Sequence, residues 1–336
     1  MTPQEVSARR PRTLAAAIAM GAGLTLLSAS TQALNIALSN DDGWMAPGIQ
    51  AMKAALVSAG HTVTLAAPLD EQSGSSAAVN ASPGDLLITK RAEGPGIQEF
   101  SVATSASGGT EGAEPASSAL VAISIAGDPD LLVTGINSGA NIGSFAQISG
   151  TVGGAIVGLG SSFNQAVPAI AISTDEVCDP EEVAVEEVDD CNAANAAHYA
   201  SVAQFMANFI AHLETKPGFL SKESDLLPPG LGLNINYPPT DNPKGVKVTV
   251  QGRTARFGVG FPVAIQFGCY ADCANAPVGA PIPGGISGIL EDETTDVRNG
   301  DAENFEKGYI TIVPIEADYT AKSPLRFKSV VNSFNY

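Results

Sequence analysis

The sequence predicts an α/β protein whose core is a Rossmann-like, doubly wound, mostly parallel sheet with a β-rich C-terminal extension. A strand–helix–strand pattern begins directly after residue 33, and a second one spans residues 131–173. The chain has 336 residues, of which 44% are hydrophobic, enough to bury a sizeable core. We therefore divide it into a signal peptide (1–33), a Rossmann-like core (34–230) and a β-rich part (231–336).

The N-terminal segment has the three-part layout of a secretory signal peptide. Arginines at 9, 10 and 12 precede an uncharged run over 13–27, and small residues lead to Ala33. A transmembrane anchor is the alternative, but the apolar run is short and rich in Ala and Gly. We expect cleavage after Ala33 and a periplasmic or secreted protein. The arginine pair leaves both Sec and twin-arginine export open.

The net charge excludes some classes of partner. The formal charge is −18, and loss of residues 1–33 would leave 14 basic and 34 acidic residues, a charge of −20. Such a surface repels nucleic-acid polymers and anionic membranes, so we expect neither as a partner after signal cleavage. A small phosphorylated substrate remains compatible where a bound metal cation reverses the local field.

Four cysteines form two pairs that are close in sequence, Cys178 with Cys191 and Cys269 with Cys273. In an exported chain this spacing favours two local disulfides. A zinc site is the alternative, but neither pair adjoins a histidine.

The first strand–helix–strand unit is predicted from hydrophobic spacing. Residues 34–39 form a buried strand, 40–43 a polar turn, Pro47 begins a helix that ends before Gly60, and 61–67 form a strand parallel to the first. The second unit repeats this order with a strand at 131–134, a helix at 150–159 and a strand at 168–173. The segments that should converge at the carboxyl ends of these strands are residues 40–43, 68–74 and 135–151.

The remaining segments have weaker patterns. Residues 101–115, rich in Ser, Ala and Gly, and the acidic run 175–190 are expected to be solvated loops. An amphipathic helix is predicted over 193–213. The later strands are expected at 231–237, 246–251, 262–267 and 309–315, completing the core or forming an arm used in assembly.

A set of oxygen ligands is expected where the strands end. Asp41 and Asp42 follow the first strand, and fixing two adjacent carboxylates together is unfavourable unless a cation compensates them or one is protonated. Ser73 and Asn137 end the loops of two other strands and add a hydroxyl and an amide oxygen. Such an all-oxygen set suits one divalent ion, Mg²⁺ or Mn²⁺, with Ca²⁺ as a further option.

An anion site is expected beside the metal. Ser149, Gly150 and Thr151 begin a predicted helix, where backbone N–H groups and the helix dipole favour a phosphate. Asn141 precedes this helix, and Asn40 stands in the turn before the carboxylate pair. We assign these five residues to substrate binding.

Four ordered motifs resemble those of the SurE (survival protein E) family: LSNDDGWMAPGIQ at 38–50, APxxxxSG at 67–74, GINSGANIG at 135–143 and SGTVGGA at 149–155. Weaker echoes are LNINYP at 233–238, TD at 295–296 and GYITIVPIEADYT at 308–320. The chain departs from the family pattern at Leu69, at Val157 and over residues 101–115. These positions flank the ligand set rather than belong to it.

The resemblance implies a metal-dependent phosphatase of the acid-phosphatase or 5′/3′-nucleotidase type, acting on nucleoside monophosphates and sometimes on short polyphosphate. Carried over by motif, the metal ligands are Asp41, Asp42, Ser73 and Asn137, and the two carboxylates also serve catalysis by steering an attacking water. The family's swapped β-rich part implies a homodimer or homotetramer.

Two other classes of function were weighed. A periplasmic protein that binds an anion or phosphate ester without catalysis would share the signal peptide and fold, but two fixed carboxylates disfavour a site built only for an anion. A dinucleotide enzyme is excluded because no GxGxxG follows the first strand. Trp44 is either a stacking platform for a nucleobase or a partly buried loop aromatic.

Overall fold

A computed structural model describes residues 33–160, 166–215, 226–228, 230–256, 262–269, 284–291 and 297–318. The predicted signal peptide, apart from its last residue, and Cys273 lie outside these ranges. Within them, no helix has both the length and the apolar character needed to span a bilayer.

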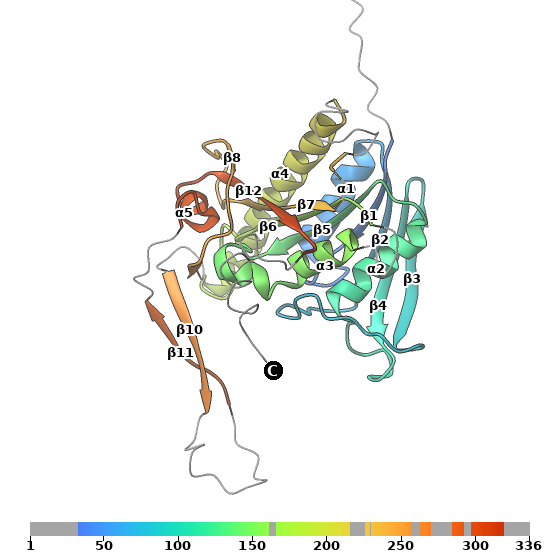
Figure 1. Ribbon diagram of the computed structural model, residues 1–336, viewed down its shortest axis with the longest axis horizontal. Helices are drawn as coiled ribbons and strands as arrows, with labels where there is room; N and C mark the ends of the chain where they lie inside the picture. The colour runs from blue at the N-terminus through green and yellow to red at the C-terminus, as the bar shows by residue number, and fades with distance from the viewer. Residues whose placement is uncertain are drawn as a thin grey trace, which may run out of the picture. The chain divides into compact units, whose positions relative to one another are not determined.

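A nine-stranded mixed sheet forms the core, in the order β3-β4-β2-β1-β5-β6-β7-β12-β8 (Figure 1). Its strands are β1 (Asn35–Ser39), β2 (Thr62–Pro68), β3 (Leu86–Gly94), β4 (Ile97–Thr104), β5 (Leu131–Ser138), β6 (Ala169–Thr174), β7 (Leu231–Tyr237), β8 (Val246–Val248) and β12 (Ile310–Glu316). The five central strands β2, β1, β5, β6 and β7 run parallel, whereas β3 and β12 are antiparallel to their neighbours β4 and β7. This confirms the predicted fold class.

A separate three-stranded sheet has the order β11-β10-β9. It consists of β9 (Ala255–Arg256), β10 (Pro262–Cys269) and β11 (Gly284–Glu291), which pair antiparallel. The C-terminal part thus divides its strands: β7, β12 and β8 join the main sheet, and β9 to β11 form the smaller one.

Helices cover both faces of the main sheet (Figure 1). α1 (Pro47–Ser58) and α4 (Val188–Glu214) pack on one face, and α2 (Pro115–Ala126) and α3 (Gly150–Leu159) on the other. Short helices α5 (Asp301–Glu306), η1 (Gly143–Gln147) and η2 (Val185–Glu187) lie in the connections. Burial on both faces explains why β1, β5 and β6 read as continuous apolar runs instead of alternating ones.

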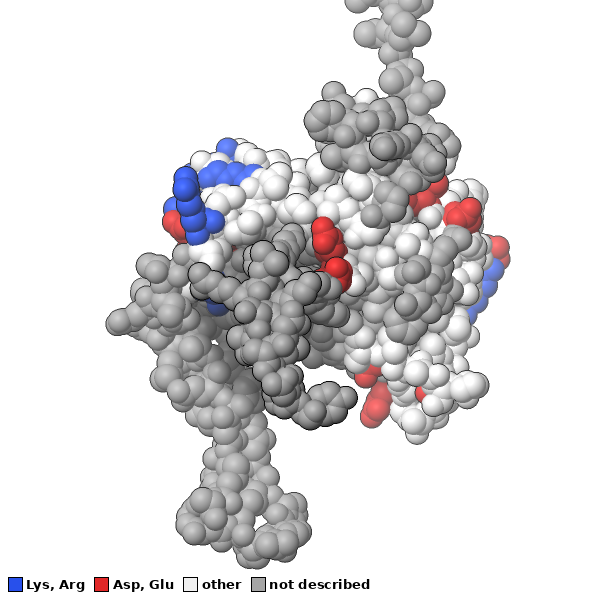
Figure 2. Space-filling view, viewed as in Figure 1, with Lys and Arg blue, Asp and Glu red and all other residues white. Residues whose placement is uncertain are grey.

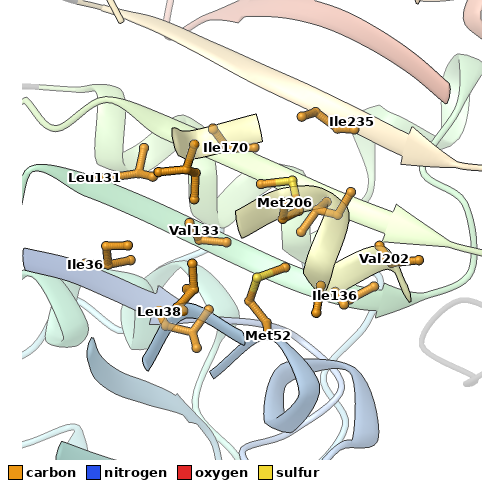
Figure 3. Packing of buried hydrophobic residues seen from close by; sticks show 14 of the residues in the cluster. Ile36, Leu38, Met52, Leu131, Val133, Ile136, Ile170, Val202, Met206 and Ile235 are labelled. Atoms are coloured by element: carbon orange, nitrogen blue, oxygen red, sulfur yellow. The ribbon is translucent and has the colours of Figure 1, made fainter. Parts of the chain in front are cut away.

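The larger hydrophobic cluster lies between the central strands and helices α1 and α4 (Figure 3). Leu38, Val133 and Ile170 from three adjacent strands meet Met52 of α1 and Met206 of α4, and all five are fully buried. Each such side chain contributes about 1.5–3 kcal/mol by leaving water. This packing holds the carboxyl ends of the strands in fixed register.

The chain reverses its direction of winding at β1. β1 pairs with β2 on one side and with β5 on the other, with Ala37 opposite Thr64 and Leu132 respectively. In open α/β sheets, ligands bind at the carboxyl ends of the strands at such a switch point. The turn that carries Asp41 and Asp42 leaves β1 at this point.

Two segments differ from expectation. Residues 101–115 are not one solvated loop, because Ser101 and Val102 are buried in β4 and Pro115 begins α2. The acidic run 175–190 ends in helix, since α4 begins at Val188, five residues before its predicted start. In both cases, composition did not show where a strand or helix of the core reaches into the segment.

The first cysteine pair is a disulfide, as predicted. Cys178 and Cys191 are bonded, with Cα atoms 5.4 Å apart, and Cys191 lies in the first turns of α4. The Cys269–Cys273 pairing stays a prediction, because residue 273 lies outside the described ranges.

Candidate active site

A pocket of about 270 Å³ opens where β1, β5 and the N-terminus of α3 meet. The polar residues that line it include Asp41, Ser73, Asn137, Asn141, Ser149 and Asp175, and Phe145 and Ile148 add apolar surface. The three segments expected to converge therefore do so.

Asp41 is anchored by the start of α3. Its carboxylate accepts hydrogen bonds from the backbone N–H of Thr151, at 3.0 Å, and from the Thr151 hydroxyl. The side chain is 2% exposed, and burial raises the pKa of Asp41 despite these hydrogen bonds. An ionised Asp41 in this position would be stabilised by a nearby cation.

Asp42 is held much less firmly. One hydrogen bond to its carboxylate is described, from the backbone N–H of Ser138 at 3.3 Å. Burial first, and then the adjacent Asp41 charge, raise the pKa of Asp42 well above its usual range. The pair therefore combines one fixed carboxylate with one that has spare acceptor capacity.

Asn137 presents an amide oxygen with no partner. Its Nδ2 donates to the carbonyls of Ser138, at 3.2 Å, and Gly139, at 2.7 Å, which fixes the orientation of the amide. Oδ1 has no hydrogen-bond partner among the described residues, although Asn137 is only 6% exposed. Leaving a buried acceptor unsatisfied costs about 1–3 kcal/mol, so a ligand for this oxygen is expected.

The strand that carries Asn137 is irregular just before it. The pairing of β5 with β6 shifts register between Thr134 and Asn137. Gly135 has a φ of 121°, and a Cβ there would lie 2.2 Å from the Ile172 carbonyl oxygen. Only glycine permits this close approach, which turns Asn137 toward the pocket.

Ser73 reaches the pocket from the loop after β2. Its residue is exposed, and its backbone N–H donates to Glu71 Oε1 at 2.6 Å. Three of the four predicted metal ligands, Asp41, Ser73 and Asn137, therefore line one pocket. Asp42 is not among the lining residues and adjoins them through its hydrogen bond from the Ser138 N–H. The role of all four as ligands stays a prediction.

Asn141 and Ser149 line the pocket as expected for substrate-binding residues. Ser149 is also the N-cap of α3, and its Oγ accepts from the Val152 backbone N–H at 3.0 Å. Asn141 is fixed by Asn236, whose side chain bonds both its backbone N–H, at 2.7 Å, and its carbonyl, at 3.2 Å.

Asn40, Gly150 and Thr151 differ from the expected role in substrate contact, since none of them lines the pocket. Thr151 is 0% exposed and uses its N–H and hydroxyl on Asp41. At Gly150 a Cβ would stand 2.9 Å from Asp41 Oδ2, so glycine allows α3 to approach the carboxylate. Asn40 is buried and donates to the Gly43 carbonyl at 2.9 Å. These three residues therefore support the turn that carries Asp41 and Asp42 and do not line the pocket.

Two acidic residues of the site were not predicted. Asp175 lines the pocket and accepts from the Ala140 N–H at 2.7 Å, and burial raises its pKa. Glu176 accepts from the hydroxyls of Ser138, at 3.0 Å, and Tyr199, at 3.2 Å. Both were assigned to a solvated acidic loop. Their position directly after a predicted parallel strand was the signal that could have found them.

Trp44 packs as a loop aromatic. It lies against the larger hydrophobic cluster, with the Arg91 guanidinium 5.2 Å from the centre of its ring, and it is not among the pocket's lining residues. The structure therefore favours the second of the two interpretations of Trp44.

The donors near the pocket are oxygens rather than the nitrogen and sulfur of a zinc centre. Across the described residues, no three side chains of the His, Cys, Asp and Glu types come close enough together to hold a metal. The predicted set has two carboxylates, an amide oxygen and a hydroxyl, so it does not need three such side chains. Its all-oxygen character suits a hard divalent cation.

Comparison with known proteins agrees with this arrangement. Residues 36–257 match the family model for survival protein SurE. The chain is similar to a 5′-nucleotidase SurE of Nitratidesulfovibrio vulgaris Hildenborough, with 31% identity over 87% of this chain and 97% of that protein. It is also similar to a 5′-nucleotidase SurE of Desulfitobacterium hafniense DCB-2, with 29% identity over 85% of this chain and 92% of that protein.

A solved structure supports the fold. The crystal structure of the SurE protein from Aquifex aeolicus aligns with a TM-score of 0.57 over 89% of this chain and 99% of that one, at 23% identity. At this identity the likeness supports the architecture alone. With the family model covering the core and its switch-point pocket, the chain belongs to the SurE family.

Proposed function

We propose that this protein is a divalent-metal-dependent phosphomonoesterase that hydrolyses nucleoside 5′- or 3′-monophosphates. One observation carries the proposal: Asp41, the unpartnered amide oxygen of Asn137 and the N-terminus of α3 meet at one pocket. The relatives named 5′-nucleotidase SurE support the nucleoside monophosphate as the substrate class.

The residues present fit one divalent ion, held by Asp41, Asp42, Ser73 and Asn137. The unpartnered Asn137 Oδ1 would gain the partner that its burial calls for. A cation would also stabilise the ionised forms of two carboxylates whose pKa values burial raises. Mg²⁺ or Mn²⁺ suits this donor set, and Ca²⁺ is a further candidate.

When bound, the ion would supply Lewis acidity, neutralising charge on the phosphoryl oxygens and lowering the pKa of an attacking water. Asp42 has spare acceptor capacity, so it orients that water and takes its proton. Thr151 keeps Asp41 in place. Asn141 and Ser149 border the phosphate, and attack is in line, with no covalent intermediate on the protein.

The test is a substrate panel on the purified full chain. 5′-AMP, 3′-AMP, p-nitrophenyl phosphate and polyphosphate are assayed with Mg²⁺, Mn²⁺ or Ca²⁺, with EDTA, and with the Asp41→Asn variant. We expect metal-dependent release of phosphate from the monoesters, abolished by EDTA and reduced by about 10³-fold in Asp41→Asn. Turnover that survives EDTA, or full activity in Asp41→Asn, would refute the metal assignment.

Binding of an anion without catalysis fits the pocket less well. Asp41 and Asp175 both line it, and its described lining residues include no Lys or Arg. An anion would therefore meet negative charge unless a metal ion is also present. Metal-dependent turnover separates this alternative from the proposed hydrolysis.

We also infer that the protein is exported and assembles as a homodimer or homotetramer. The Cys178–Cys191 disulfide supports an oxidising compartment. Mass spectrometry of the protein from a periplasmic or secreted fraction should give an N-terminus at Leu34, and light scattering should give two or four times the chain mass. An intact residue 1 in that fraction, or a monomer mass, would contradict the respective inference.

A further inference from the structure

The segment after β6 is strongly acidic, and its start is tied to α4. Residues 175–190 contain nine Asp and Glu residues. The Cys178–Cys191 disulfide joins the segment to the first turns of α4. Asn195 of α4 bonds the same stretch, accepting from the N–H groups of Val177, at 3.0 Å, and Cys178, at 3.2 Å, and donating to the Cys178 carbonyl at 2.7 Å. The beginning of this segment is therefore built into the fold.

This attachment makes Asp175 part of the pocket wall. Asp175 Oδ1 accepts from Ala140 N–H, and Asp175 lines the same pocket as Asp41 and Asn137. The following residue, Glu176, is held by the hydroxyls of Ser138 and Tyr199. A carboxylate thus lines the same pocket as Asp41, Ser73 and Asn137, and the proposed hydrolysis does not use it.

The described part of the pocket lining does not offset this charge, because no Lys or Arg is among its described residues. On the face shown in Figure 2, the Lys and Arg side chains gather mainly over the α5–β8 corner, with a smaller group at the opposite edge near β3. The phosphoryl group that is hydrolysed would contact the metal ion directly, whereas further phosphates on the substrate would face Asp175 with no counter-charge from the described lining residues.

We propose that Asp175 is a specificity-determining residue that selects phosphate monoesters against substrates carrying additional phosphates next to the one hydrolysed. Those disfavoured substrates are nucleoside diphosphates and triphosphates and inorganic polyphosphate. The proposal rests on the phosphatase function proposed above. Repulsion between Asp175 and one added negative charge a few ångströms away corresponds to about a tenfold loss of affinity at a dielectric between those of protein and water.

The test compares the wild type with Asp175→Asn, which keeps the shape and the acceptor oxygen for Ala140 N–H and removes the charge. Glu186→Gln is the matched control, because it removes one charge from the same segment at an exposed residue of η2 outside the pocket. kcat and KM are measured for 5′-AMP, 5′-ADP and tripolyphosphate at fixed free Mg²⁺. Thermal unfolding checks that both variants are folded.

We expect Asp175→Asn to improve kcat/KM for 5′-ADP and tripolyphosphate by about tenfold or more relative to 5′-AMP, mainly through KM. Glu186→Gln should leave the ratio within twofold of wild type. An unchanged ratio in Asp175→Asn, or an equal change in both variants, would overturn the proposal.

A binding measurement keeps this inference distinguishable from the proposed function. Calorimetry gives the affinities of orthophosphate and tripolyphosphate for each protein without turnover. If the wild type hydrolyses no ester, the proposed function fails, but a tripolyphosphate affinity that rises selectively in Asp175→Asn still supports charge selection. Wild-type binding of tripolyphosphate as tight as that of the variant, or no phosphate binding by either protein, overturns it.

Discussion

Two groups of polar side chains stand at neighbouring strand ends and differ in how their hydrogen bonds are satisfied. The open group, Asn40, Asp42 and Asn137, follows or belongs to β1 and β5, and two of its amide oxygens have no partner in the described structure. The closed group lies next to it and consists of Asn141 in the loop after β5, Ser173 of β6 and Asn236 of β7, which bond to one another. The open group has capacity for a ligand, and the closed group holds the loop that faces that ligand.

This difference suggests that the open group binds the ligand, whereas the closed group stabilises the surrounding structure. Buried polar atoms are normally hydrogen-bonded, so the unpartnered amide oxygens of Asn40 and Asn137 at adjacent strand ends indicate a missing partner of opposite polarity, although other unpartnered oxygens, such as Asn234 Oδ1, occur elsewhere in the described residues. The closed group shows that the fold can also satisfy buried amides by contacts within the protein. Substitutions in the two groups should therefore have different consequences.

The largest effect is expected for Asp42→Asn in the open group. An amide cannot accept the water's proton and binds a divalent ion more weakly, so kcat for a monoester should fall by about 10³-fold. Steady-state kinetics at saturating Mn²⁺ measure this, with Glu186→Gln as the charge control. A kcat within tenfold of wild type would remove Asp42 from the mechanism.

Asn137→Ala should weaken metal binding and leave the free energy of unfolding nearly unchanged. Loss of the free amide oxygen should weaken metal binding by about 10- to 100-fold. The free energy of unfolding without metal should change by less than about 1 kcal/mol, because an unsatisfied acceptor is removed together with two hydrogen bonds. Calorimetric titration with Mn²⁺ and urea unfolding measure the two quantities. A large loss of stability at unchanged metal affinity would place Asn137 in the supporting group.

Asn236→Ala should show the opposite pattern. It leaves the buried backbone N–H of Asn141 without its described acceptor, at a cost of about 1–3 kcal/mol in unfolding free energy. The metal affinity should stay within about threefold of wild type, since no atom of Asn236 belongs to the open group. Unchanged stability combined with weakened metal binding would contradict the distinction between the two groups.

Sequence patterns predicted the open group better than the closed one. The open group's members Asp42 and Asn137 were predicted as metal ligands because each stands at the end of a predicted parallel strand, and such ends meet at one edge of a sheet. The pairing of Asn141 with Asn236 joins residues 95 positions apart and depends on the place of β7 beside β6, which periodicity does not determine.

The roles of Thr151 and Asp175 were predicted wrongly for the same reason: they depend on contacts with distant residues. Thr151 was expected at the substrate because helix N-termini bind anions, but its N–H and hydroxyl are directed to a carboxylate of the protein itself. Asp175 was grouped with a solvated acidic run, since composition does not show that Ala140 and Asn195 hydrogen-bond to the start of that run. Local signals locate candidate residues, and tertiary contacts decide which of them faces the ligand.

The smallest effect is expected for His198, a neighbour of the closed group, on the pH dependence of stability. His198 Nε2 lies 2.7 Å from Thr174 Oγ1, next to Ser173 on β6. Two carbonyls, of Asp175 and Tyr237, compete for the single hydroxyl hydrogen of Thr174, so we assign Nε2–H as a donor to Thr174. Nδ1 is then unprotonated and has no partner among the described residues, and burial lowers the pKa of His198.

The sign of the pH effect follows from this lowered pKa. Below about pH 6.5, the ordinary histidine pKa, the unfolded chain takes up a proton that folded His198 resists. The contribution of His198 to stability is therefore complete above that pH and is lost as the pH falls. His198→Gln keeps an N–H donor toward Thr174 without titrating, so its unfolding free energy should decline less between pH 7 and pH 5. Because His61 also has a lowered pKa and is present in both proteins, the difference between the two urea-unfolding series isolates His198. Equal declines of unfolding free energy with pH in the two proteins would mean that protonated His198 finds a partner in the folded protein, and would contradict the role of its lowered pKa.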